Sequence, residues 1–120
     1  MKLRIEGNSL RLRLNQKEVA TLRQGGHVES SIEFAPQCSL SYSLESANSL
    51  SATFDGHMIR VTIPAQQLTN WAQTEQIGIE ASSQTGVSLL IEKDFKCLHR
   101  NPDQEPDAFP RPGKPTWQQP

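Results

Sequence analysis

The segment Ile91-Glu-Lys-Asp-Phe-Lys-Cys-Leu-His-Arg100 leaves an apolar strand and leads into a proline-rich tail. Val87, Leu89 and Ile91 occupy every second position just before it and at its start, which is the period of a half-buried strand. The segment gathers charged side chains, an aromatic ring, a thiol and an imidazole within a short length of chain. We therefore expect the rest of the chain to be arranged around it.

The same period of two recurs along the preceding chain and predicts seven further strands. Leu10, Leu12 and Leu14, for example, alternate with two arginines. Asp55-Gly56 is a strong signal for a two-residue hairpin turn. The eight expected strands cover 2–6, 9–14, 28–34, 40–44, 50–54, 57–63, 77–81 and 87–91.

A first helix is expected over 16–24. Asn15, with Glu18 three residues later, matches a helix start, because asparagine accepts hydrogen bonds from the free amides of the first turn. Gly25-Gly26 then ends the helix, since glycine adopts the left-handed conformation without strain.

A second helix over 65–73 follows Pro64, because Leu68 and Trp71 fall at helical spacing. The order is then two strands, a helix, four strands, a helix and two strands. Short connections and local hairpins favour antiparallel pairing. We therefore predict an α+β fold: a single antiparallel sheet of about eight strands, curled or barrel-like as a variant, with two short helices. The similar order on either side of Ser46 is too weak to establish an internal duplication.

The chain has 120 residues, of which 35% are hydrophobic, so one small domain is expected. We place the globular domain at 1–100 and a tail at 101–120. Most of the prolines lie between Pro102 and Pro120, and such a segment buries too little surface to offset its ordering entropy. We expect 101–112 to dock on the domain and the remainder to be disordered.

The net charge and the first residues of the chain bear on which classes of protein are expected. The 12 basic and 13 acidic residues give a net charge of −1, which argues against nucleic-acid binding through a basic surface. The chain begins directly in a strand pattern, so we expect no secretion signal, no membrane span and a cytoplasmic location. In that compartment Cys38 and Cys97 are expected as thiols rather than as a disulfide.

The first candidate site is a set of cations for an anionic ligand. Arginines that point away from the apolar side of neighbouring strands form a site for phosphate or carboxylate. The alternative is cross-strand pairing with outward glutamates such as Glu6 and Glu80, worth only about 0–1 kcal/mol per pair. Arg60 is a further outward arginine, and the candidate ligand-binding residues are Arg4, Arg11, Arg13, Lys93 and Arg100.

The second candidate site is formed by Cys97 and His99. In an extended strand, residues two apart share a face, so this thiolate and imidazole can bind zinc or iron together, with Asp94 adding an oxygen ligand. The same pair also suits a reactive thiol, because a nearby imidazolium stabilises thiolate. The alternative is a buried thiol beside a surface histidine, since structural zinc sites usually show two paired ligand motifs.

The tail is the third candidate. We expect its acidic residues to pair with Arg11 and Arg13 while Phe109 enters a pocket; the alternatives are a motif that binds another protein and a simple linker. The acidic residues are Asp103, Glu105 and Asp107.

Catalytic templates are absent from the sequence, which has no Gly-rich phosphate loop and no HExxH, GxSxG or CxxC motif. A non-enzymatic role is therefore favoured. The first hypothesis is a binding domain for a small anion or a protein partner, without a cofactor. The second is a metal-binding or reactive-thiol protein. The third is an assembly subunit whose exposed sheet edge or tail pairs with another chain, and the oligomeric state stays open.

Three segments resemble a family of small uncharacterised bacterial proteins: Ile5-Glu-Gly-Asn-Ser-Leu-Arg-Leu-Arg-Leu14, Glu92-Lys-Asp-Phe-Lys-Cys-Leu-His-Arg100 and Asp107-Ala-Phe-Pro110. The resemblance extends over nearly the whole chain. It implies a more acidic tail that ends Phe-Pro-Asn-Pro, whereas here Arg111 replaces the asparagine and Pro106 interrupts the acidic run. The resemblance implies no activity, and it directs attention to the same segments and to the tail.

Overall fold

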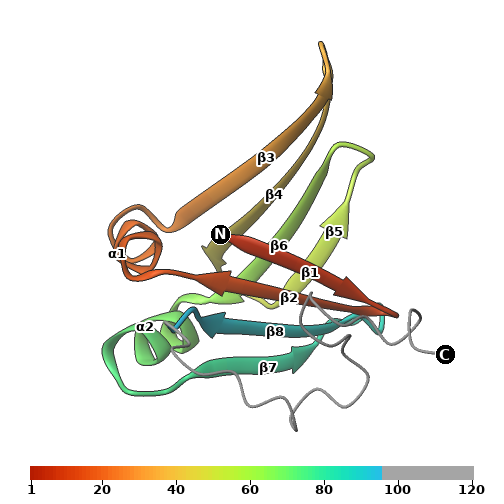
Figure 1. The fold of residues 1–120 in the computed structure, drawn as a ribbon. Coiled ribbons are helices and arrows are strands. Elements are labelled where there is room, and N and C mark those ends of the chain that lie inside the picture. The colour runs from red at the N-terminus through yellow and green to blue at the C-terminus, as the bar shows by residue number, and fades with distance from the viewer. Residues whose placement is uncertain (96–120) are drawn as a thin grey trace, which may run out of the picture.

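A computed structural model describes residues 1–95, in which eight strands and two helices follow one another in the expected order (Figure 1). The second helix has the expected bounds, and the first is one residue longer than expected. The elements are β1 (Lys2–Glu6), β2 (Ser9–Leu14), α1 (Gln16–Gly25), β3 (His27–Ala35), β4 (Cys38–Ala47), β5 (Ser51–Phe54), β6 (Met58–Pro64), α2 (Ala65–Gln73), β7 (Gly78–Ser82) and β8 (Ser88–Lys93).

The expectation of a single antiparallel sheet is wrong. The strands form two four-stranded sheets, with the orders β1-β2-β8-β7 and β3-β4-β6-β5. Each local hairpin is antiparallel, but the central pairs, β2 with β8 and β4 with β6, are parallel. Hairpin signals in the sequence carry no information about these central pairs, because each one joins strands that are distant along the chain.

The two halves of the chain share one order of elements and one pattern of pairing. The series β1, β2, α1, β3, β4 corresponds to β5, β6, α2, β7, β8, and each sheet combines the first hairpin of one half with the second hairpin of the other. The register agrees as well, because Leu12 lies beside Ile91 in one parallel pair as Val61 lies beside Leu44 in the other. The weak symmetry of the sequence is therefore a structural repeat with interlocked halves.

Local chemistry fixes the ends of the first helix. The Asn15 side chain accepts a hydrogen bond from the Glu18 amide at 2.8 Å, and the Glu18 carboxylate accepts one from the Asn15 amide at 3.0 Å. Gly26 ends α1 with a φ of 70°, a left-handed conformation that favours glycine. The capping predicted for α1 is thus confirmed.

The helices lie at the same end of the molecule, where the carboxyl ends of the four central strands converge (Figure 1). Neither helix of the described chain has the length and apolar character needed to cross a bilayer. Trp71 of α2 is fully buried, and its indole N–H donates to the Ile77 carbonyl at 3.0 Å. The buried apolar residues of the core come from both sheets and both helices: Leu12, Leu14, Leu22, Val28, Leu44, Val61, Ile63, Leu68, Trp71, Ile79, Leu89 and Ile91.

Leu44 tests the contribution of the parallel pairs to stability. Its side chain is fully buried beside Val61, so Leu44→Ala should lower the free energy of unfolding by about 2–5 kcal/mol. Ile5→Ala is the matched control, because Ile5 is 60% exposed, and it should change that free energy by less than about 1 kcal/mol. Urea titration followed by tryptophan fluorescence measures both. Equal losses in the two variants would contradict this account of the core.

Candidate functional site

The outward side of the β1-β2-β8-β7 sheet carries most of the cations singled out from the sequence. The strand register places Arg4 opposite Arg11, Arg11 beside Leu90, and Leu90 opposite Glu80. Because residues two apart share a face, the residues two positions further along each strand also point outward. We call the cationic part of this surface the arginine face, and its members are Lys2, Arg4, Arg11 and Arg13.

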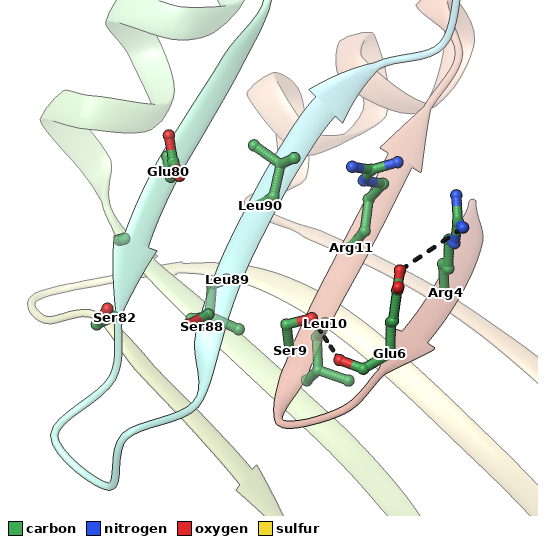
Figure 2. Close-up of a pocket in the computed structure, with 11 residues that line it drawn as sticks. Arg4, Glu6, Ser9, Leu10, Arg11, Glu80, Ser82, Ser88, Leu89 and Leu90 are labelled. Atoms are coloured by element: carbon green, nitrogen blue, oxygen red, sulfur yellow. Dashed lines mark hydrogen bonds and ion pairs between the residues drawn. The ribbon is translucent and has the colours of Figure 1, made fainter. Parts of the chain in front are cut away.

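A hollow of about 400 Å3 lies on this side of the sheet, between the arginine face and the β7–β8 hairpin. Figure 2 shows the Arg4 and Arg11 side chains projecting on the same side as Leu90 and Glu80. The lining combines polar and apolar surface and is mixed in charge, with three serines at one end. The residues that line the hollow are Arg4, Glu6, Ser9, Leu10, Arg11, Glu80, Ala81, Ser82, Ser88, Leu89 and Leu90.

Glu92 of β8 is the carboxylate that the two arginines of β2 share. Its Oε1 atom lies 3.0 Å from Arg13 Nε and 3.3 Å from Arg11 Nε. The side chain of Glu92 is only 16% exposed, against 35% for Arg11. Two guanidinium charges thus converge on one half-buried carboxylate, which leaves a positive excess at this point of the sheet.

Arg4 adds a further positive charge on the edge strand. It pairs with Glu6 at 3.6 Å, and its side chain is 64% exposed. An ion pair this long and this exposed contributes little to stability. Since Arg4 and Arg11 face each other directly across two antiparallel strands, their like charges disfavour the pairing in the absence of an anion.

Asp94 lies next to the arginine face, where Lys2 Nζ approaches its carboxylate to 2.8 Å. The hydrogen bond from Lys2 lowers the pKa of Asp94 below its ordinary value of 3.8. Cys97 and His99, the other two residues of the expected metal site, lie outside the described residues. Among residues 1–95, no cluster of three or more histidine, cysteine, aspartate or glutamate side chains is placed to hold a metal.

Lys93 does not join the arginine face. Its ammonium donates to the Thr74 carbonyl at 2.7 Å and lies 5.9 Å from the centre of the Trp71 ring. Lys93 has the same strand parity as the buried Ile91, so its stem runs towards α2. Three more of the residues predicted from the sequence, Cys97, His99 and Arg100, lie outside the described residues, as does the whole tail from 101 to 120.

The β3-β4-β6-β5 sheet contains a counterpart of one arginine–glutamate pair of the site but no counterpart of its other cations. Arg60 Nε lies 3.4 Å from Glu45 Oε1, and the strand register makes this pair the counterpart of Arg11 with Glu92. The positions equivalent to Lys2, Arg4 and Arg13 are occupied by uncharged residues. These counterparts are Ser51, Thr53 and Thr62.

Alternation in the sequence predicts the outward arginines and, as the alternative to a ligand, their pairing with glutamates such as Glu6, which does contact Arg4. Neither Glu92 as the partner of Arg11 and Arg13 nor the hydroxyls of Ser9, Ser82 and Ser88 were predicted as part of the site. Strand parity places each of these side chains outward, so alternation was a usable signal. The adjacency of β2 and β8, which brings them to the arginines, has no local signal.

Two interlocked mixed sheets with two short helices define a small α+β domain. The chain belongs to a family of unknown function, DUF7009, whose model matches residues 1–113. The predicted membership of an uncharacterised family is therefore confirmed. Comparison with curated proteins and with solved structures gives no match.

The carboxyl of Asp94 provides a test of the geometry beside the arginine face. Its pKa should lie below 3.8, and Lys2→Met should raise it towards that value by removing the hydrogen-bonded ammonium. The contact then contributes to stability above pH 3.8, and this contribution disappears as the pH falls through the lowered pKa. Carboxyl carbon chemical shifts measured by NMR against pH give both values.

Asp55 is the internal control for this titration. The amides of Met58 and His57 lower its pKa, and neither amide depends on Lys2. The pKa of Asp55 should therefore be the same in the two proteins. An unchanged Asp94 pKa in the Lys2→Met variant would show that the two side chains do not interact in solution.

Proposed function

We propose that this domain binds a small anion, a phosphate or a carboxylate group, on the arginine face above the hollow. Binding is carried by Arg4 and Arg11, with Lys2 and Arg13 adding to the local potential. The observation that carries the proposal is the direct opposition of Arg4 and Arg11 across the β1–β2 hairpin. A guanidinium presents paired N–H donors in a plane, which suits bidentate contact with phosphate or carboxylate.

The charge balance supports an anion at this point. Glu92 is already engaged by Arg11 and Arg13, and Glu6 makes only a long contact with Arg4. An anion between Arg4 and Arg11 removes the like-charge repulsion between two directly opposed cations. The ligand therefore gains Coulomb energy and also relieves an unfavourable interaction of the free protein.

The hollow beside these arginines has a size suited to a small ligand. Its volume of about 400 Å3 falls in the range of small-molecule sites. Ser82 and Ser88 offer hydroxyl donors, whereas the Ser9 hydroxyl already donates to the Glu6 carbonyl. Glu6 and Glu80 disfavour additional negative charge on a ligand. This arrangement favours a compact anion over an extended polyanion, in keeping with the net charge of −1.

Comparison of the two sheets supports a role for these cations beyond folding. The Arg60–Glu45 pair occupies the same register as Arg11–Glu92, so one such pair per sheet is compatible with a common structural role. The extra cations Lys2, Arg4 and Arg13 occur in one sheet alone among the eight described strands. A fold that forms its second sheet without them does not need them in the first.

Isothermal titration calorimetry with inorganic phosphate, pyrophosphate and citrate tests the proposal. Arg4→Gln and Arg11→Gln should each weaken binding by about tenfold or more, because each removes one charge-assisted contact of roughly 1.5–3 kcal/mol. Arg60→Gln is the matched control, since it breaks the equivalent ion pair in the other sheet. It should leave the affinity unchanged.

Two outcomes would reject the proposal. The first is the absence of measurable heat with every anion at millimolar concentration. The second is an equal loss of affinity in Arg4→Gln and Arg60→Gln, which would indicate a general charge effect rather than a site. Circular dichroism of each variant separates loss of binding from loss of folding.

Glu92→Gln should increase the affinity for the same anions. The carboxylate competes with the ligand for Arg11 and Arg13, and its removal leaves both guanidiniums free to bind. We expect the dissociation constant to fall by about threefold to tenfold at low ionic strength and by less at high salt. Glu45→Gln, the counterpart in the other sheet, should have no effect. A weaker affinity in Glu92→Gln would show that this carboxylate positions the arginines.

A further inference from the structure

The β3–β4 hairpin is longer than its counterpart in the repeat. β3 and β4 have 9 and 10 residues, whereas β7 and β8 have 5 and 6. The register places Ser31 and Ser41 at the positions of Ser82 and Ser88, where the shorter hairpin turns. In Figure 1 the outer part of β3–β4 rises away from the rest of the molecule. We call this outer part, residues 32–40, the arm.

The arm exposes apolar side chains that the fold itself does not bury. Ile32 is 50% exposed and Phe34 is 69% exposed. Every residue of β3 from Ser31 onwards is exposed. A two-stranded ribbon without a packed face is only marginally stable in water. The shorter β7–β8 hairpin shows that this fold closes a hairpin without such an extension, so the arm requires another explanation.

β3 is also the end strand of its sheet and the longest of the four end strands in the described chain. Its edge therefore presents a row of backbone donors and acceptors from His27 to Glu33, before the pairing with β4 becomes irregular between Glu33 and Ala35. The other three end strands have only four or five residues. Short edges are a usual protection against pairing with another chain, and β3 lacks this protection.

We propose that β3 pairs antiparallel with β3 of a second copy of this chain, with Ser30 on the two-fold axis. This register places Val28 opposite Ile32 of the other copy and His27 opposite Glu33 of the other copy. The β3-β4-β6-β5 sheets of the two copies then form one continuous sheet across the dimer. Ile32 and Glu33, at the start of each arm, lie along the base of the other copy's β3, so that Ile32 extends the apolar face begun by the buried Val28.

Charge favours this register over the neighbouring one. A slip of one residue in the pairing moves every side chain of a strand to the other face of the sheet, so only slips of two residues keep the apolar side chains on one face. The neighbouring register, centred on Ser31, places Glu29 opposite Glu33 and is disfavoured by like charges. The register centred on Ser30 pairs Val28 with Ile32 and places Glu33 opposite His27, whose ring already contacts Glu45 and Glu29 of its own chain.

Replacing the arm by the turn of its counterpart tests this inference. In this variant residues 32–40 are exchanged for the five residues Ser-Gln-Thr-Gly-Val that stand at 83–87. The shortened hairpin should fold, because the equivalent hairpin of the same fold has this form, and it should be monomeric. Multi-angle light scattering from micromolar to millimolar concentration should show a concentration-dependent dimer for the unaltered chain and a monomer for the shortened variant. Circular dichroism reports the folding of both proteins.

A point variant narrows the test to the apolar contact. Ile32→Ser should weaken dimerisation by about tenfold or more, because an apolar side chain is lost from both copies of a symmetric interface. Phe54→Ser is the matched control, since Phe54 is 63% exposed on the opposite end strand of the same sheet. It should leave the dimer unchanged.

Disulfide trapping tests the register. With Cys38 and Cys97 both replaced by serine, Ser30→Cys should form an intermolecular disulfide on mild oxidation, whereas Gln84→Cys in the shorter hairpin should not. A full chain that stays monomeric at millimolar concentration would overturn the inference, as would a dimer that survives replacement of the arm. The result is independent of the proposed anion site, because Arg4 and Arg11 lie in the other sheet.

Discussion

Parallel pairing between the two halves of the chain is the constraint on which the rest of this structure depends. β2 lies beside β8 and β4 lies beside β6, so each sheet is completed only when both halves are present. Several of the most deeply buried apolar residues, such as Leu44 and Val61, lie on these pairs. The same pairing brings Glu92, near the end of the described chain, to Arg11 and Arg13 near its start. Core and candidate site therefore form together.

Local physical chemistry explains why the elements could be predicted from the sequence. Alternation reveals strands, Asn15 and Glu18 cap a helix through contacts three residues apart, and Asp55 forms a turn through amides two and three residues away. Each of these signals lies within a few residues. The division into two sheets depends instead on pairs separated by most of the chain, for which a single sequence offers no comparable signal. The prediction of one antiparallel sheet was wrong for this reason.

The candidate site was likewise predictable only where its sequence signals are local. Parity correctly placed Arg4, Arg11 and Arg13 on an outward face, because alternation on β1 and β2 is local. Lys93 was expected beyond the end of a strand over 87–91, where parity gives no information. The strand in fact continues to Lys93, which therefore shares the parity of the buried Ile91 and lies outside the arginine face. The contact with Glu92 and the hollow could not be predicted, since both depend on the adjacency of β2 and β8.

An interlocked repeat provides a comparison within one molecule, because each half meets the same geometric requirements. Features present in both halves, such as the Arg11–Glu92 and Arg60–Glu45 pairs, are those that this geometry accommodates generally. Features present in one half only are not required by the geometry, and each has a physical cost. Opposed arginines repel one another across the β1–β2 hairpin, and an exposed arm presents apolar surface to water. Since the other half has neither feature, the proposed anion and the proposed second copy of the chain would each offset one of these two costs.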